Sequence, residues 1–374
     1  QRAWIEVSGK AIEANVRYLR SKLKNNCEFM AVVKADGYGH DAKVVSKNAI
    51  KGGASQLGVA TLKEGIKLRS FGINAPILVL GNLYTKKDLL ICFRNNLMPT
   101  VSTFRECLIC NNIGKSNNFK FSLHLKVDTG MSRLGFECDQ FNQQFNIIKS
   151  LENIAVKGIY SHLACADEKN ALNPKSSTQL QKEKFQELLK IIDIDNTENI
   201  KIHLANSAGM ILGKDFHFDM VRVGLSMYGY SPLANINENL FLKPALFLKA
   251  KVTFVRTIEK GIGVSYGNKF VSDRKTKLAV LSIGYADGII RNLSGKISLI
   301  HNKKLYTQVG SITMDQMMVD ITDSNDIKVG STMLLLGSEG DKSISPIDWA
   351  EKCNSIPWEI LCSFKNRLPR VQVD

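Results

Sequence analysis

The chain has 374 residues, 44% of them hydrophobic and 23% charged, a composition typical of a globular protein with two domains or one barrel plus an appendage. Its net charge is +15, but the basic residues are dispersed without interleaved aromatic residues, which argues against nucleic-acid binding. No run approaches the roughly 20 apolar residues that cross a membrane, and eight cysteines, scattered except for Cys107 and Cys110, indicate reduced core thiols in a cytoplasmic protein without a metal site.

The first strong pattern is an apolar run over residues 29–33 that ends at Lys34. A short run rich in valine predicts a buried strand, and the Asp-Gly-Tyr-Gly that follows predicts a loop. Partial burial at such a junction favours the free amine of a lysine. A free amine is the nucleophile that forms a Schiff base with an aldehyde such as pyridoxal phosphate. The alternative is a solvated lysine at a strand end, which is the commoner situation.

Apolar, β-branched runs recur through the first part of the chain and alternate with segments of helical periodicity. Eight such runs predict strands, at residues 29–33, 56–60, 77–80, 98–101, 123–127, 156–160, 202–205 and 221–225. Helical periodicity is clearest over 61–70, 86–94, 138–150 and 175–192. This alternation favours parallel pairing and predicts a (β/α)8 barrel over residues 1–242. The weakest links are the run that contains Pro99 and the short helix after Ser207.

The pattern changes after Lys243-Pro244. Closely spaced strand candidates follow, and they leave little room for crossover helices. They cover residues 247–257, 277–283, 296–300, 305–309, 317–321 and 332–336. This spacing predicts a second, mainly antiparallel β domain over residues 243–374. One helix is predicted over 345–353, where Pro346 suits the first turn.

Polar residues collect at the carboxyl ends of the predicted barrel strands, where barrel enzymes build their active sites. They are Lys34 after the first strand, Lys126, Asp128 and Arg133 at and beyond the fifth, His162 after the sixth, Asn206 and Ser207 after the seventh, and Arg222 and Gly224 in the eighth. The loops after strands seven and eight commonly bind phosphate, which the Ser207 hydroxyl and the Gly224-Leu225 amides would suit.

Each of these residues also has a purely structural explanation. Ser207 could cap a helix, His162 could be a core histidine, and Arg222 could pair with a structural carboxylate. Their convergence on one end of a barrel favours a functional site over three unrelated structural roles.

Eight segments of the chain, in this order and at these spacings, resemble those of the alanine racemase family. They read AVVKADGYGH, KVDTGMSRLGF, IYSHLACADE, HLANSAGM, DMVRVGLSMYG, VSYGNKF, SIGYADG and SITMDQMMVDIT. No single motif is decisive, but together they extend over essentially the whole chain. The family's fold is a (β/α)8 barrel followed by a β domain. The resemblance implies a pyridoxal 5′-phosphate-dependent isomerase that interconverts L- and D-alanine and supplies D-alanine for cell-wall peptidoglycan.

The resemblance also implies two bases. Lys34 resembles the lysine that binds the cofactor, and Tyr266 resembles the catalytic tyrosine, so that one base would stand on each face of the substrate Cα. In the family two chains form a homodimer, and the tyrosine of one chain completes the barrel site of the other. His162 and Arg222 resemble the hydrogen-bonded pair that supports the tyrosine. Arg222 also resembles the arginine placed against the pyridine nitrogen.

Further site residues follow from the same resemblance. Arg133 resembles the residue bonded to the ring hydroxyl, and Lys126 resembles a lysine that some members carry in carbamylated form. Met314 and Asp315 resemble residues near the substrate carboxylate, and Tyr285 resembles one that lines the substrate channel. Arg133 is also expected to contact the substrate. The other expected cofactor-binding residues are Tyr38, Asn206, Ser207, Gly224, Leu225 and Trp358.

Two segments depart from the family pattern. Trp358 stands where the family usually has a tyrosine whose hydroxyl reaches the phosphate. An indole N–H on a longer ring predicts weaker cofactor binding. The segment from Gly310 to Met314 reads Gly-Ser-Ile-Thr-Met and differs from the usual Gly-Arg-x-Cys-Met, which leaves contacts near Met314 open.

Two other functions stay open. One is a racemase for another amino acid such as serine or lysine, because a methylene in a pocket is worth only about 1 to 3 kcal/mol of discrimination. The other is a pyridoxal-phosphate-binding barrel without catalytic turnover. Tyr266 and the motif-rich second half argue against the latter, because such carriers resemble the barrel alone.

Overall fold

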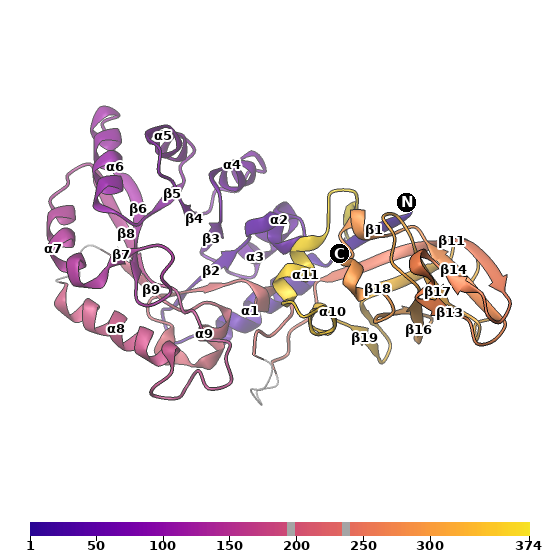
Figure 1. Cartoon of the computed structure of the whole chain (residues 1–374). Helices are drawn as coiled ribbons and strands as arrows, with labels where there is room; N and C mark the ends of the chain where they lie inside the picture. Colours follow the sequence, from indigo (N-terminus) through magenta and orange to yellow (C-terminus); the bar gives the residue numbers. More distant parts are fainter. Residues whose placement is uncertain (193–198, 234–239) are drawn as a thin grey trace. The chain divides into compact units, whose positions relative to one another are not determined.

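The computed structural model describes residues 1–192, 199–233 and 240–374, and the chain divides into two compact units (Figure 1). One unit comprises residues 10–37 and 45–243, and the other comprises residues 1–9, 38–44 and 244–374. Among the described residues, every helix is too short or too polar to span a membrane.

The first unit is a closed barrel of parallel strands. In chain order its strands are β2 (Glu28–Val32), β3 (Gln56–Val59), β4 (Ile77–Asn82), β5 (Met98–Val101), β6 (Phe121–Asp128), β8 (Ile154–Tyr160), β9 (Lys201–His203) and β10 (Met220–Val223), with the short β7 (Phe136–Glu137) beside β6. The barrel closes because β10 pairs with β2 and β5 pairs with β6, both in parallel. The predicted (β/α)8 barrel is confirmed, with all eight predicted strands present.

One helix precedes the first barrel strand and others follow the strands, and they cover the outside of this barrel (Figure 1). They are α1 (Gly9–Ser21), α3 (Ala42–Lys51), α4 (Leu62–Ser70), α5 (Lys86–Arg94), α6 (Phe104–Ser116), α7 (Cys138–Lys149), α8 (Ser177–Ile191) and α9 (Ser207–Leu212). Threonine caps begin α4, α5 and α6, and in α4 and α6 a glutamate three residues later completes a capping box. Such a box satisfies two backbone N–H groups that the first helical turn leaves without partners.

Two features of the barrel differ from what the sequence pattern suggested. Pro99 made the fourth run look like an edge, yet β5 pairs on both sides, with β4 and with β6. The proline is tolerated because it lies at the start of a short strand whose pairing with β4 is irregular.

The helix α6 was not predicted because cysteines supply part of its buried face. Cys107 and Cys110 are fully buried there, and burial raises the pKa of both thiols.

The second unit is built on a mainly antiparallel sheet. Its strand order is β19-β18-β15-β16-β17-β14-β11-β1-β20, and β11 also pairs with β18. The strands are β1 (Ala3–Val7), β11 (Leu246–Ile258), β14 (Thr276–Leu281), β15 (Ser298–His301), β16 (Lys304–Val309), β17 (Met317–Asp320), β18 (Thr332–Glu339), β19 (Lys342–Ile344) and β20 (Arg370–Gln372). Among the strand pairs described in this sheet, only β1–β20 is parallel. All six predicted strands are present, and the predicted antiparallel β domain is confirmed.

Smaller elements complete this unit. The helix α10 (Pro346–Cys353) begins with a Ser345 capping box and a proline in its first turn, as predicted, and α11 (Pro357–Ser363) follows it without having been predicted. A short hairpin of β12 (Gly263–Val264) and β13 (Phe270–Val271) carries the single turn η3 (Tyr266–Asn268) between its strands.

The N-terminal segment belongs to the β unit, whereas the sequence placed residues 1–9 with the barrel. Ala3 to Val7 pair antiparallel with Ala250 to Leu246, and alternate residues of β1 are buried. A partner strand about 240 residues away leaves no local signal in the sequence, so this pairing could not be read from periodicity.

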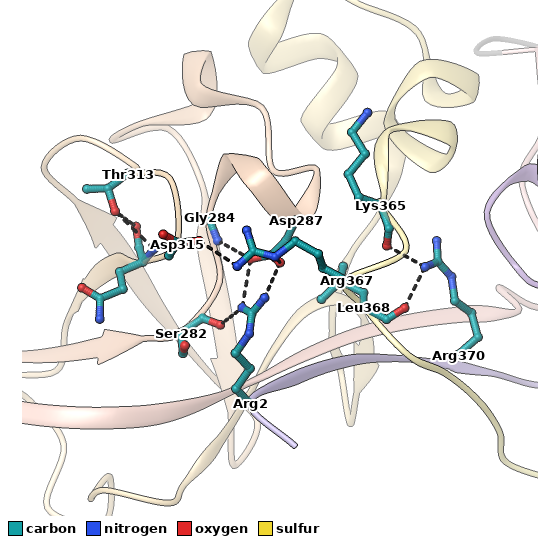
Figure 2. A network of polar contacts seen from close by, with 11 residues as sticks. Arg2, Ser282, Gly284, Asp287, Thr313, Asp315, Lys365, Arg367, Leu368 and Arg370 are labelled. Carbon is teal, nitrogen blue, oxygen red and sulfur yellow. Dashed lines mark hydrogen bonds and ion pairs between the residues drawn. The ribbon is translucent and has the colours of Figure 1, made fainter.

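A buried carboxylate fixes this N-terminal segment (Figure 2). Asp287 is 0% exposed and accepts hydrogen bonds from both terminal nitrogens of Arg2, one of them at 3.0 Å. It also accepts the Gly284 N–H at 3.0 Å, and Arg367 Nε lies 3.5 Å from it. Arg367 in turn donates to Asp315 at 2.8 Å. The network therefore joins the chain's second residue to loops that begin 282 positions later, at Gly284.

Candidate active site

Lys34 lies two residues after the end of β2 and leads into a left-handed turn. Residues 35–38 all have φ between 51° and 65°, a conformation that side chains with a Cβ rarely adopt. The turn is anchored by Glu64, whose carboxylate accepts the Ala35 N–H at 2.8 Å while it also completes the capping box of α4. This anchor places Lys34, half-buried, at the carboxyl end of the first barrel strand.

Arg222 lies on β10, is 3% exposed, and donates to neutral acceptors. One nitrogen donates to His203 Nδ1 at 2.9 Å. The other donates to the carbonyl oxygens of Ser161 (2.7 Å) and Leu204 (3.0 Å) and to His162 Nδ1 at 3.0 Å. Burial lowers the pKa of Arg222 to about 10, so it stays a cation at neutral pH. Arg222 is therefore a rigid buried charge whose described hydrogen-bond partners include no carboxylate.

The histidines around Arg222 are neutral and have defined tautomers. A guanidinium only donates, so Nδ1 of both His203 and His162 must accept, which leaves the proton of each ring on Nε2. His203 Nε2 lies 2.9 Å from His124 Nδ1. Burial, followed by the nearby charge of Arg222, lowers the pKa of His162 and His203 well below the ordinary value and that of His124 to about 3.

Tyr160 and Lys126 lie beside this network. Tyr160 stacks on His203 with ring centroids 4.6 Å apart and its hydroxyl is 2.7 Å from Thr100 Oγ1. The Lys126 ammonium lies over the Tyr160 ring at 5.8 Å. His203 and Tyr160 were not predicted as site residues, because a polar residue inside an apolar strand shows no role until its partner on another strand is known.

Four cations share this end of the barrel. Lys126 is 4% exposed, and burial, followed by the charges of Arg133 and Arg222, lowers its pKa to about 8. Lys34 acts in the same direction, and among the described charges that act on Lys126 only Asp128 opposes it. The same four cations lower the pKa of the half-buried His162. Four cations against the one carboxylate of Asp128 give this end of the barrel a net positive charge, which suits a negatively charged ligand.

The Asp128 carboxylate fixes the backbone of the loop that carries Arg133. Its carboxylate accepts the N–H groups of Gly130 (2.8 Å), Met131 (2.9 Å) and Arg133 (3.2 Å). Burial alone would raise the pKa of Asp128, but these backbone hydrogen bonds outweigh it and hold the pKa below its ordinary value. The Arg133 side chain is left exposed at the barrel end.

The expected phosphate loops are interlocked after β9 and at β10. Asn206 caps α9 by accepting the Gly209 N–H at 2.9 Å, so the cap is Asn206 rather than Ser207. Ser207 Oγ accepts the Gly224 N–H at 2.9 Å. That amide is thus engaged within the protein, which differs from its expected role. The Ser207 hydroxyl proton and the Leu225 backbone N–H are the groups in this pair of loops that suit a phosphate.

Tyr38 and Trp358 both belong to the second unit, near α11. Tyr38 is buried, and burial raises the pKa of its phenol. Gly39 packs directly on α11, since a Cβ at this position would lie 2.3 Å from the Leu361 carbonyl oxygen. Cys362 on α11 interacts electrostatically with Tyr38. Trp358 lies one turn earlier, on the same face as Cys362, and is half-buried.

The remaining predicted residues lie on adjoining loops at one end of the β unit. Tyr266, in η3, is 71% exposed, and Met314 is 53% exposed. The N–H groups of Tyr285 and Ala286 donate to the carbonyl oxygens of Thr313 (3.0 Å) and Met314 (2.9 Å). The structure therefore brings Tyr285, Met314 and Asp315 together, with Asp315 held by the ion pair shown in Figure 2.

The barrel end fits pyridoxal phosphate chemically. It combines a half-buried lysine, a rigid buried arginine and further cations, which suit an anionic aromatic cofactor bound through an amine. These features, with the second β domain, define the class of the protein: a barrel enzyme whose site suits an anionic cofactor.

The comparisons with known proteins identify the family. Residues 7–232 match the alanine racemase N-terminal domain and residues 245–372 match the alanine racemase C-terminal domain. The chain belongs to the alanine racemase family, which confirms the resemblance found in its motifs.

Individual relatives match over the full length. The alanine racemase of Prochlorococcus marinus is 52% identical over 373 residues, which cover 100% of this chain and 96% of the relative. The structure of alanine racemase from Clostridium difficile 630 has a TM-score of 0.91 at 32% identity and covers 100% and 96% of the two chains. The Bartonella henselae alanine racemase structure, which has covalently bound pyridoxal phosphate, has a TM-score of 0.87 at 30% identity and covers 100% of both chains.

Proposed function

We propose that this chain interconverts L-alanine and D-alanine with pyridoxal 5′-phosphate as its cofactor. The proposal is carried by one observation, the cluster of Lys34, Lys126, Arg133 and Arg222 around the neutral His162. Such a cluster offers an amine, a rigid cation and anion-binding charge at the place where a barrel enzyme does its chemistry. The family to which the chain belongs uses this cofactor.

The proposed cofactor-binding roles are those that the family resemblance implies, and the chemistry of each side chain suits them. The Lys34 amine would hold the cofactor, and Arg133 would contact its ring hydroxyl. The phosphate would be bound by Ser207 and the Leu225 amide, with Tyr38, Asn206 and Trp358 as the further proposed contacts. Arg222 would face the pyridine nitrogen, where a rigid cation that only donates disfavours protonation of that nitrogen.

Lys34 and Tyr266 would be the two bases. When bound, the cofactor withdraws electrons from the substrate Cα and makes its hydrogen acidic enough for a protein base to remove. One base takes that proton from one face, and the other returns a proton to the opposite face. After one turnover the first base is protonated and the second is not, which is the state required for the reverse direction.

The other roles place the tyrosine and the substrate. His162 carries its proton on Nε2 because its Nδ1 accepts from Arg222; a donor of this kind would stabilise the Tyr266 phenolate. Met314, Asp315, Tyr285 and Arg133 are proposed to contact the substrate. We further propose a homodimer in which Tyr266 of one chain serves the barrel of the other, consistent with the 71% exposure of Tyr266. The cytoplasmic location stays a prediction.

The decisive experiment follows the chirality of an amino acid. Purified protein with pyridoxal phosphate is incubated separately with L-alanine, L-serine and L-lysine, and the enantiomers are separated by chiral chromatography. We expect alanine to reach a racemic mixture fastest. Faster loss of chirality from serine or lysine would assign the other substrate, and cofactor binding without any loss of chirality would support a carrier and refute the proposal.

Two variants test the bases. Tyr266→Phe should keep the absorbance of the bound cofactor and lose turnover by about 100- to 10,000-fold, whereas Lys34→Ala should lose both. Tyr84→Phe is the matched control, because Tyr84 is 78% exposed and has no proposed role. Retained activity in Tyr266→Phe would remove that residue from the mechanism.

Mixing the same two variants tests the shared active site. If Tyr266 serves the partner's barrel, each mixed dimer contains one intact site, and random exchange should restore about a quarter of the wild-type sites. If each site uses one chain only, the mixture stays inactive although dimers form.

A further inference from the structure

The loop that presents Tyr266 has a strained backbone. Ser265, the preceding residue, has φ 67° and ψ −172°, a region that is almost exclusively occupied by glycine. A serine stays in such a conformation only where its surroundings hold it there. Because the Tyr266 side chain is 71% exposed, the direction of its ring depends mainly on this backbone.

Two reciprocal hydrogen bonds hold the loop. Ser265 Oγ donates to the Ser311 carbonyl oxygen at 2.8 Å, and Ser311 Oγ donates to the Tyr266 carbonyl oxygen at 2.8 Å. Ser311 is 1% exposed, so water does not compete well for these bonds. The Asn268 N–H closes the turn by donating to the Ser265 carbonyl oxygen at 3.2 Å. We call the pair Ser265 and Ser311 the serine latch.

The Ser311 side of the latch is itself fixed to the β unit. Gly310 has φ 68°, and a Cβ there would lie 2.7 Å from the Val264 carbonyl oxygen, so the two segments are in direct contact. The buried Gln308 donates to the Gly310 carbonyl oxygen at 2.9 Å, and the Ile312 N–H donates to Ser294 Oγ at 2.9 Å. The residues on both sides of Ser311, Gly310 and Ile312, are thus fixed by hydrogen bonds. This fixes the position of the hydroxyl that bonds to Tyr266.

We propose that Ser311 is a positioning residue that aims the Tyr266 phenol at the substrate Cα. The inference rests on the proposed function, since it takes Tyr266 as one of the two bases. Ser311 stands where the usual family pattern has arginine, a residue without a hydroxyl, so that pattern does not include this contact. The hydroxyl acts on the Tyr266 backbone and leaves the cofactor contacts of the barrel untouched.

Ser311→Ala in the full chain with bound cofactor tests this role. We expect kcat to fall by about 10- to 100-fold, because proton transfer is sensitive to small misplacements, with the KM for alanine and the cofactor absorbance nearly unchanged. The Cα-deuterium isotope effect on kcat should rise in the direction in which Tyr266 removes the proton and fall in the reverse direction. A merely structural role would lower both directions without separating their isotope effects.

Three further variants keep the test sharp. Ser272→Ala removes a 2.7 Å hydrogen bond from a buried hydroxyl to the Glu259 carbonyl oxygen and should leave kcat unchanged. Ser311→Thr keeps the hydroxyl and should retain most activity. If Ser311→Ala does not fold, Ser265→Gly tests the other half of the latch, because glycine accepts this φ without strain, and it too should lower kcat.

The outcomes separate the inference from the proposed function. Wild-type protein that racemises no amino acid would overturn the proposed function before any latch variant is measured. If wild-type protein is active and Tyr266→Phe is not, wild-type kcat and isotope effects in both Ser311→Ala and Ser265→Gly would overturn the latch alone. An equal loss in Ser272→Ala would also overturn it.

Discussion

Replacing Lys126 by methionine tests the electrostatics of the barrel end. Lys126 is 4% exposed, and burial together with Arg133 and Arg222 lowers its pKa from 10.5 to about 8. At about 1.4 kcal/mol per pH unit, that difference corresponds to about 3 kcal/mol. Keeping the Lys126 ammonium charged lowers the free energy of unfolding by this amount.

The pH dependence follows from the direction of this shift. The folded pKa lies below the unfolded one, so between pH 8 and 10.5 the unfolded chain binds more protons and stability rises with pH. Charged Lys126 therefore lowers the free energy of unfolding by its full amount below pH 8 and no longer lowers it above pH 10.5. The lost contact with the Tyr160 ring is worth about 0.5 to 1 kcal/mol. We expect Lys126→Met to raise the free energy of unfolding by about 2 to 3 kcal/mol at pH 7 and by almost nothing near pH 10.

The assay is urea unfolding of the cofactor-free protein at several pH values, followed by helical circular dichroism. Most helices of the described chain lie in the barrel unit, so this signal reports on the barrel. Lys190→Met, an exposed position on α8, is the matched control and should change stability by less than about 0.5 kcal/mol.

Destabilisation of Lys126→Met at pH 7 would refute the reasoning for an unmodified lysine. Carbamylation is the specific alternative, because carbon dioxide adds to a neutral amine, and with a pKa of about 8 about a tenth of Lys126 is neutral at pH 7. The product is an anion among three cations and would be stabilising. Removal of carbon dioxide would then restore the expected gain, and ¹³C-labelled bicarbonate would give a carbamate signal that Lys126→Met lacks.

Three other changes test parts of the site and its support. Trp358→Tyr should tighten pyridoxal phosphate binding about 3- to 10-fold by adding a hydroxyl for the phosphate, as measured by absorbance titration; unchanged affinity would contradict the weaker binding predicted for tryptophan. Glu64→Ala removes the acceptor of the Ala35 N–H and should cost about 1 to 3 kcal/mol and weaken cofactor binding. Asp348→Ala, which removes the half-buried capping-box carboxylate of α10, should leave cofactor binding intact. Asp287→Asn leaves Arg2 and Arg367 without their buried anionic partner. It should lower the free energy of unfolding by about 1 to 3 kcal/mol, less than breaking a fully buried pair would, because both arginines are partly exposed. Trp349 fluorescence during heating would report this loss of stability, and the surface variant Asp341→Asn should show none.

Much of the fold could be predicted because it depends on local patterns. The barrel strands are continuous apolar runs, since parallel strands are covered on both faces. Their regular alternation with helices then restricts the topology to very few choices. The β domain was recognisable because its strands follow one another too closely for crossover helices.

What could not be predicted depends on distant partners. The residues of β1 form an ordinary alternating strand, and only the structure shows that β11 is their partner. Arg2 and Asp287 are 285 positions apart, so neither residue signals the ion pair. The same limit applies to His203, which acquires a role only because Arg222 on the next strand donates to it.

The candidate site was easier to locate than to interpret. Strand ends identify the residues that share the barrel end, but they do not say which groups are already engaged. Gly224 illustrates the difference: its amide lies in the expected loop, yet it donates to Ser207. Position along a strand is fixed by topology, whereas the direction of an N–H group depends on the packing of two loops.

The network around Arg222 orients charge without conducting protons. Arg222 donates to His203, and the proton on His203 Nε2 points to His124 Nδ1. The sequence of donors ends there, because His124 Nε2 is buried and has no hydrogen-bond partner among the described residues. With no exit for a proton through His203 and His124, and with histidines whose low pKa values keep them neutral, the positive charge stays on Arg222. A fixed charge of this kind suits the pyridine nitrogen proposed as its partner, and the movement of protons is left to residues outside the network, as the roles of Lys34 and Tyr266 require.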